Sequence, residues 1–191
     1  DALHTFMTAT YTDGSKLSPH EITGLLIATM FAGHHTSSGT ATWALVELLR
    51  NPQCMEEVKQ ELAEVFSEGG EVSHHAMRGM PKMEAFIREV LRVHPPLSTL
   101  IRVVEQDFVY QDFVIPKGYR VVMSPGVAHK IAEVFPEPEK FDMHRPEPEH
   151  LFAWLAFGGG RHKCAGNAFA ILQLKAIFAT LLMDFDFELS H

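Results

Sequence analysis

The chain has few of the features that mark secreted or nucleic-acid-binding proteins. Only two of its 191 residues are cysteines, Cys54 and Cys164, and they lie far apart in different sequence contexts. This usage excludes a disulfide framework and fits a reducing compartment. Lys and Arg number 16 against 24 Asp and Glu, and the resulting net charge of −8 argues against general nucleic-acid binding.

Long uninterrupted apolar segments are scarce in the first part of the chain. The run from Ile22 to Gly33 is interrupted by Thr23 and Thr29 and is too short to span a bilayer, so no membrane anchor is visible. The chain begins at Asp1, without Met or a signal peptide, and we therefore expect a piece of a longer protein. With 46% hydrophobic and 21% charged residues, it can bury a sizeable core.

Capping and proline signals predict three helices. Ser18-Pro19-His20-Glu21 is a capping box with Pro at the first helical position, and no breaker follows before Asn51-Pro52, which predicts a helix of about thirty residues. Gln53 to Phe66 predicts an amphipathic helix, and Pro81 to His94 predicts a third, stopped by Pro95-Pro96. The second helix has a charged face that we expect to be solvated: Glu56, Glu57, Lys59, Glu61 and Glu64.

The second half of the chain begins with strand signals. Residues 108–110, 113–115 and 119–123 are rich in β-branched and aromatic residues, and the turns between them predict a β-meander. The Pro- and Glu-rich segment 135–148 is expected to be irregular but ordered. An apolar run from Ala165 to Phe185 predicts a final helix.

A glycine-rich loop, Phe157-Gly-Gly-Gly-Arg-His-Lys-Cys164-Ala-Gly166, precedes that final helix. A thiol at a helix start lies near unpaired amides and the positive end of the dipole, and both favour the thiolate. A thiolate is an axial ligand for haem iron, and glycines let a loop approach a flat macrocycle. The alternative is a tight turn with an inert core cysteine.

The loop resembles the haem-binding loop of the cytochrome P-450 family at Phe157, Gly158, Gly160, His162, Cys164 and Gly166. The resemblance implies haem b with Cys164 as the iron ligand. It also implies a mainly α fold with small β-sheets. Residues 1–191 would be one partial domain that lacks its N-terminal part and its extreme C-terminus.

The middle of the long predicted helix carries a second resemblance. Gly33 costs a helix about 1 kcal/mol relative to Ala, and Thr36 can bond back to the Ala32 carbonyl and loosen the turn, leaving a pocket for a diatomic ligand and water. The stretch resembles the oxygen-activating motif of the family, with Thr36 as the alcohol. Most members carry an acid at the position of His35. The histidine there, with Phe31 nearby, is similar to the sterol 14α-demethylases.

The resemblance makes His35 a proton relay for bound oxygen, because an imidazole titrates near neutrality. The alternatives are that His34 and His35 form a surface pair or a metal site. Adjacent helical residues diverge by about 100°, so the two cannot chelate one ion together. For His34 a packing role is expected.

A Glu-x-x-Arg pair, Glu89 and Arg92, lies among apolar residues of the third predicted helix. It resembles the structural ion network of the family, which a distant arginine completes after a Pro-Glu-rich segment. Arg145 ends such a segment here. The resemblance implies that this network fixes the fold behind the haem loop.

The segment from Leu97 to Arg102 is expected to be a strand beside the haem. The resemblance implies that Leu97 and Leu100 face the substrate, together with Phe31 and Ala32, and that Arg102 and His162 bind the haem propionates. The alternative for Arg102 is an exposed strand arginine. Most members use arginine in place of His162, and histidine there is again similar to the sterol demethylases.

A small basic patch of Arg161, Lys163 and Lys175 is expected to flank the thiolate. In an acidic chain it could dock an acidic electron donor such as a ferredoxin, or a reductase. Three residues make a thin patch, and whether it docks a donor stays open from the sequence.

The implied function is oxidative removal of the 14α-methyl group of a sterol precursor, using O2 and electrons from a redox partner. One alternative is hydroxylation of another apolar substrate, such as a terpenoid or fatty acid. Another is that this truncated chain binds haem without activity, or does not retain it. If the protein is bacterial, it is expected in the cytoplasm. Whether a membrane anchor precedes Asp1 stays open from the sequence.

Overall fold

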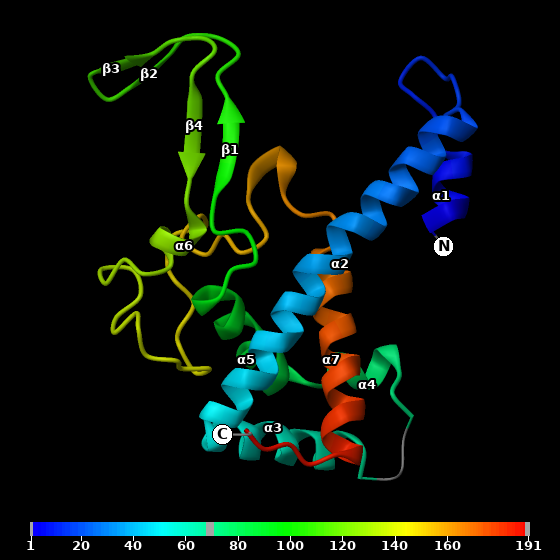
Figure 1. The fold of residues 1–191 in the computed structure, drawn as a ribbon, viewed down its shortest axis with the longest axis vertical. Coiled ribbons are helices and arrows are strands. Elements are labelled where there is room, and N and C mark those ends of the chain that lie inside the picture. The colour runs from blue at the N-terminus through cyan, green and yellow to red at the C-terminus, as the bar shows by residue number, and fades with distance from the viewer. Residues whose placement is uncertain (1, 68–70, 190–191) are drawn as a thin grey trace. The chain divides into compact units, whose positions relative to one another are not determined.

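The computed structural model describes residues 2–67 and 71–189, and Figure 1 shows their course. The chain divides into two compact units, residues 1–39 and 40–191, and helix α2 passes from the first into the second. The helices are α1 (Ala2–Thr8), α2 (Pro19–Arg50), α3 (Pro52–Val65), α4 (His74–Arg78), α5 (Pro81–Val93), α6 (Pro125–Ala128) and α7 (Asn167–Asp184). The strands are β1 (Leu100–Val103), β2 (Phe108–Tyr110), β3 (Phe113–Ile115) and β4 (Arg120–Met123), and a 3-10 turn, η1, covers Gly160–His162.

The first unit contains α1, a turn closed by the bridge between Thr10 and Lys16, and the first part of α2. The predicted capping box is confirmed: the Ser18 amide donates to Glu21 Oε2 at 2.8 Å, and the Glu21 amide donates to Ser18 Oγ at 3.3 Å. Hydrogen bonds from Ser18 and from the Tyr11 hydroxyl lower the pKa of Glu21 to about 2. The long helix therefore begins where its local sequence dictates.

The core of the second unit lies between α3, α5, α7 and the C-terminal part of α2. In Figure 1, α3 crosses the ends of α5 and α7, and all three helices contact one another. Helix α5 contributes most, because its apolar residues recur at helical spacing on the face turned inward. Its buried apolar residues are Met83, Phe86, Ile87, Val90 and Leu91.

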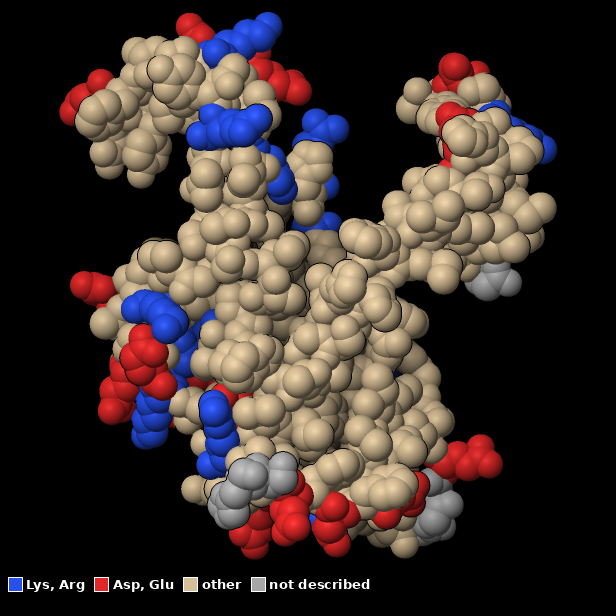
Figure 2. Space-filling view, in the orientation of Figure 1, with Lys and Arg blue, Asp and Glu red and all other residues tan. Residues whose placement is uncertain are grey.

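One charged residue of α3 is not on a solvated face, contrary to the prediction. Glu61 is 4% exposed, and its carboxylate accepts hydrogen bonds from the amides of Lys82 and Met83 at 2.7 and 2.8 Å. These amides belong to the first turn of α5, which has no capping side chain of its own. Glu61 thus supplies from another helix the acceptors that a helix start needs. The other acidic side chains of α3 lie at the surface, and Figure 2 shows the acidic residues that gather there.

Replacing Glu61 with glutamine is expected to lower the free energy of unfolding by about 1–3 kcal/mol. The variant keeps the shape of the side chain but leaves one buried amide of α5 facing an NH2 group instead of an oxygen. Chemical denaturation measures the change. Glu64→Gln, at an exposed position one turn further along α3, is the matched control and should change stability by less than about 0.5 kcal/mol. Equal effects of the two variants would contradict the capping role.

The predicted strands exist, but the predicted meander is wrong. β2 pairs only with β3, whereas β4 pairs antiparallel with β1, from Leu100 opposite Met123 to Val103 opposite Arg120. Gly118, with φ of 89°, turns the chain back towards Val104. The Gly118 amide donates to the Val104 carbonyl at 2.8 Å, and the Val104 amide donates to the Tyr119 carbonyl at 2.9 Å. These bonds align β4 with β1 and leave β2 and β3 as a separate hairpin (Figure 1).

Helix α7 has the length and composition of a membrane span, unlike the shorter run in α2 that we considered from sequence. It also packs into the core through Leu174, Phe178, Ala179 and Leu182, and it carries a buried lysine, Lys175. The core helix of a soluble domain passes the same test of length and composition. Its contacts in the second unit bury part of its apolar surface, while Phe169 and Met183 stay exposed.

Candidate functional site

The cysteine loop is held open by its backbone. Gly158 and Gly160 have φ of 69° and 67°, which side chains disfavour. The Cys164 amide donates to the Phe157 carbonyl at 2.9 Å, and the Gly158 amide donates to the Leu155 carbonyl at 2.8 Å. The loop leaves the Cys164 thiol exposed, three residues before α7 begins.

The cap of α7 is also shaped around the sulfur. Gly166 is the residue before the helix, and a Cβ placed there would lie 3.8 Å from Cys164 Sγ. The missing side chain leaves the space beside the thiol uncovered. An exposed thiol that no neighbouring side chain covers can ligate the metal of a flat macrocycle.

Strand β1 lies beside this loop. A Cβ at Gly158 would come within 3.8 Å of Leu100 Cδ1, so the structure brings these two predicted site residues together. Leu97, Arg102 and His162 are exposed. The Arg102 guanidinium donates to the Ile101 carbonyl at 2.9 Å. The loop and β1 therefore meet at Gly158 and Leu100, and they carry His162 and Arg102, two exposed side chains that can bind carboxylates.

The predicted oxygen-activating stretch lies in the first unit. Thr36 Oγ1 donates to the Ala32 carbonyl at 2.6 Å, as predicted, but the expected opening of the helix does not occur. α2 stays α-helical from Pro19 to Arg50, because the side-chain bond adds to the backbone ladder without replacing it. The His35 ring lies edge-on to Phe31, with centroids 5.7 Å apart, and 4.8 Å from the His34 ring.

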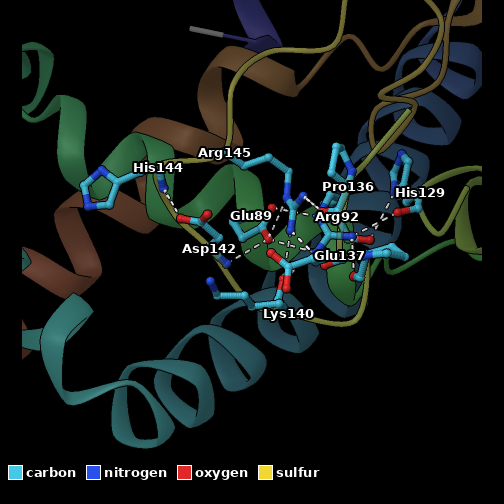
Figure 3. Close-up of polar contacts among 10 residues, drawn as sticks. Glu89, Arg92, His129, Pro136, Glu137, Lys140, Asp142, His144 and Arg145 are labelled. Carbon is cyan, nitrogen blue, oxygen red and sulfur yellow. Dashed lines mark hydrogen bonds and ion pairs between the residues drawn. The ribbon is translucent and has the colours of Figure 1, made fainter. Parts of the chain in front are cut away.

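The predicted ion network is assembled as expected (Figure 3). Arg92 Nε and Nη2 bind the two oxygens of Glu89 at 2.7 and 2.8 Å, and Arg145 Nε approaches Glu89 Oε1 at 3.3 Å. Glu89 and Arg92 are 5% and 2% exposed. The remaining guanidinium N–H groups donate to backbone carbonyls of the irregular segment: Pro136, Glu137, Pro138 and Lys140, with His129 just before it.

This arrangement explains why a segment without helix or strand between 135 and 148 is ordered. Its carbonyls have no ladder partners, and two arginines supply the donors instead. The Asp142 amide also donates to Glu89 Oε1 at 3.0 Å. A buried ion pair with all its hydrogen bonds satisfied holds the segment against α5.

The expected basic patch is reduced, because Lys175 is not on the surface. Lys175 is 2% exposed, and its ammonium binds Glu84 at 2.5 Å and the Met77 carbonyl at 3.1 Å. It therefore ties α7 to α5 and cannot contact a partner protein. Arg161 and Lys163 are exposed in the cysteine loop.

A further cluster, not predicted from the sequence, lies where α2 and α5 end. His94 stacks on Trp43, with centroids 3.9 Å apart and planes 6° from parallel. His94 Nε2 lies 2.9 Å from a carboxylate oxygen of the buried Glu47, whose other oxygen accepts from Asn51. The spacing of Trp43 and Glu47 at i and i+4 was a usable signal, but nothing in the sequence names their partner.

His129 is a second residue of interest that was not predicted from the sequence. It follows the short helix α6 and is fully buried. Burial lowers its pKa, outweighing a hydrogen bond to the Arg92 backbone. No motif flagged it among the twelve histidines of the chain.

A metal site made only of side chains is not found in the described chain. Among residues 2–67 and 71–189, no group of three or more His, Cys, Asp or Glu side chains is placed to hold an ion. The metal-site alternative for His34 and His35 therefore gains no support.

Comparison with known proteins adds independent information. The family model described as "Cytochrome P450" matches residues 1–191. The chain is 45% identical to a sterol 14α-demethylase of Mycolicibacterium vanbaalenii, over 94% of this chain and 41% of the relative. It is 46% identical to that of Mycobacterium tuberculosis, over 92% and 40%. An obtusifoliol 14-alpha demethylase of Triticum aestivum is 39% identical, over 99% and 45%.

A solved structure shares the fold. The retinoic acid bound cyanobacterial CYP120A1 superposes with a TM-score of 0.89 and is 29% identical, covering 100% of this chain and 45% of that one. The chain thus spans about two fifths of the length of the curated relatives it matches. The mainly helical architecture with small antiparallel sheets, predicted from sequence, is confirmed.

Proposed function

Because the chain belongs to the cytochrome P-450 family, we propose that it is part of a haem-thiolate monooxygenase that oxidatively removes the 14α-methyl group of a sterol precursor. The observation that carries the proposal is the exposed Cys164 thiol in a glycine-shaped loop at the start of α7. The whole protein would use O2 and electrons from a donor such as a ferredoxin or a reductase.

The cofactor of this family is a haem held by a cysteine thiolate, and haem b is the form expected here. When bound, it supplies the activation of O2. The loop fits such a group: the thiol is exposed, and the glycines keep side chains away from a flat ring. Cys164 would ligate the iron, while Arg102 and His162 would bind the two propionates.

The proposed proton-handling residues are Thr36 and His35. The Thr36 hydroxyl gives its hydrogen to the Ala32 carbonyl, so towards any further partner its oxygen acts as an acceptor. It can therefore hold a water or a protonated group in place. The His35 imidazole can take a proton at one ring nitrogen and release it from the other.

The proposed substrate contacts are apolar, and all except the half-buried Leu100 are exposed in this chain. Phe31 is 71% and Leu97 54% exposed, and Ala32 and Leu100 are the other two residues expected to shape the cavity. Side chains of this kind fit a sterol, which has a large apolar surface. The names of the relatives, all 14α-demethylases, favour a sterol over other apolar compounds.

Spectral titration tests the substrate assignment. The haem-loaded protein, expressed from its whole reading frame, is titrated with a 14α-methyl sterol. Binding of the sterol beside the haem should shift the haem absorption band in proportion to occupancy. A protein that shows the thiolate-ligated carbon monoxide band but no shift with sterol would contradict the sterol assignment and leave the haem assignment standing.

A second candidate substrate is a different apolar compound. It is favoured by the retinoic acid bound in the structural relative. Parallel titrations with retinoic acid, which is a terpenoid, and with a fatty acid distinguish this candidate from the sterol. The third possibility, that the 191-residue chain alone holds no functional haem, is tested by reducing it under carbon monoxide: absence of the thiolate band would support it.

His35→Ala should retain haem and sterol binding while uncoupling electron use from product. Product formation should fall by about 10²-fold, the lower end of what a positioned proton donor contributes, while consumption of reducing equivalents continues. Product and electron consumption are measured together. His34→Ala is the matched control and should leave coupling unchanged. Unchanged coupling in His35→Ala would exclude the relay.

A further inference from the structure

His129 joins the ion network to the polypeptide that leads into the cysteine loop. The ring is fully buried and lies between Phe135, edge-on at 5.9 Å, and Trp154, stacked at 6.4 Å. These contacts hold the plane of the imidazole. Its two nitrogens consequently point in set directions, towards the end of α5 and towards the segment before the loop.

Each nitrogen has one backbone partner, and the partners determine the tautomer. The Leu155 amide donates to Nε2 at 2.9 Å, and Nδ1 lies 3.1 Å from the Arg92 carbonyl. An amide can only donate and a carbonyl can only accept, so Nε2 must carry no proton and Nδ1 must carry one. The neutral ring is the form that satisfies both, and burial lowers the pKa of His129 in the same direction.

The bonds continue on both sides of the ring. On one side, the carbonyl of His129 accepts from Arg92 Nη1 at 2.9 Å, so the residue is bonded to Arg92 twice (Figure 3). On the other side, the Leu155 carbonyl accepts from the Gly158 amide at 2.8 Å, and the Phe157 carbonyl accepts from the Cys164 amide at 2.9 Å. These hydrogen bonds, joined by short stretches of backbone, lead from the buried ion network to the Cys164 amide.

We propose that His129 is a positioning residue for the thiolate, acting through the bond from the Leu155 amide to Nε2. This bond fixes the position of Leu155, whose carbonyl accepts the hydrogen bond from the Gly158 amide in the first turn of the cysteine loop. The inference rests on the proposed role of Cys164 as haem ligand. Without an acceptor at Nε2, the part-buried Leu155 amide is left without its partner. The entry to the loop then shifts, and the sulfur is held less firmly against the iron.

Two substitutions separate the two nitrogens. The longer side chain of His129→Gln can place its amide oxygen near the position of Nε2 and keep the bond to Leu155. His129→Asn reaches only about as far as Nδ1, so it keeps a donor for the Arg92 carbonyl and loses the acceptor. Both are tested in the haem-loaded protein from the whole reading frame. His144→Gln, at an exposed histidine, is the control.

The readout is the carbon monoxide spectrum of the reduced protein, which distinguishes thiolate-ligated from thiol-ligated haem, together with the reduction potential of the iron. His129→Gln should keep the thiolate-ligated fraction of the unmodified protein, and His129→Asn should lose most of it. Circular dichroism verifies that the helix content is unchanged. A role in folding alone would change stability without changing the ligation of haem in the folded protein.

The result that overturns the proposal is a glutamine variant that behaves like the asparagine variant, whether both keep the thiolate band, both lose it, or both fail to fold. An asparagine variant that does not fold, beside a glutamine variant with the full band, also overturns it, because the bond to Leu155 would then serve folding and not the ligation of haem. Absence of the thiolate band in the unmodified protein would instead contradict iron ligation by Cys164, and with it the basis of this inference.

Discussion

Cys164→Ser should abolish the thiolate-ligated spectrum of the reduced, carbon monoxide-bound protein completely. A serine hydroxyl does not ionise near neutral pH and lacks the soft, electron-rich sulfur that haem iron needs as an axial ligand. Since Cys164 is exposed and its loop is shaped by glycine conformations and backbone bonds, the fold should survive the change. Absorption spectroscopy and circular dichroism of the same sample check both expectations.

Cys54→Ser is the matched control for that experiment. Cys54 is half-buried in α3, and burial, followed by the charge of Glu57, raises the pKa of its thiol. It therefore stays a neutral packing residue at neutral pH. We expect the variant to keep the whole thiolate band. A band that persists in Cys164→Ser, or disappears in Cys54→Ser, would contradict the ligand assignment.

Glu89→Gln is expected to destabilise the protein by about 3–5 kcal/mol, the usual cost of breaking a buried ion pair. Two guanidinium groups, of Arg92 and Arg145, would lose their shared counter-charge in a site that is almost closed to water. Denaturant unfolding measures the change. The destabilisation should also loosen the carbonyls that the two arginines bind, so retention of haem is measured alongside.

Glu147→Gln is the control for the ion network. Glu147 binds Arg88 of the same helix α5 at 2.7 Å, but its side chain is 71% exposed, and surface pairs contribute little, about 0–1 kcal/mol. The two substitutions therefore make the same chemical change at different depths. If both cost the same, the buried network is not what holds the segment from 135 to 148.

How much the sequence predicted depends on the range of the interaction. The start of α2 follows from Ser18 and Glu21, three residues apart, and the end of α5 follows from the prolines after His94. The strands were found, but their pairing was not. Tyr119 bonds Val104 across the β2–β3 hairpin, and no pattern within β4 shows that its partner is β1.

The sequence by itself determined the features that depend on neighbouring residues: the helix ends, the glycine-shaped cysteine loop, and the residue types of the ion network. Only the tertiary structure decided which charged and titratable groups are buried. Glu61 and Lys175 were expected at the surface and His129 was not singled out, yet each is buried against a partner far along the chain. Burial of a polar group depends on a partner that satisfies it, and packing, not local sequence, supplies that partner.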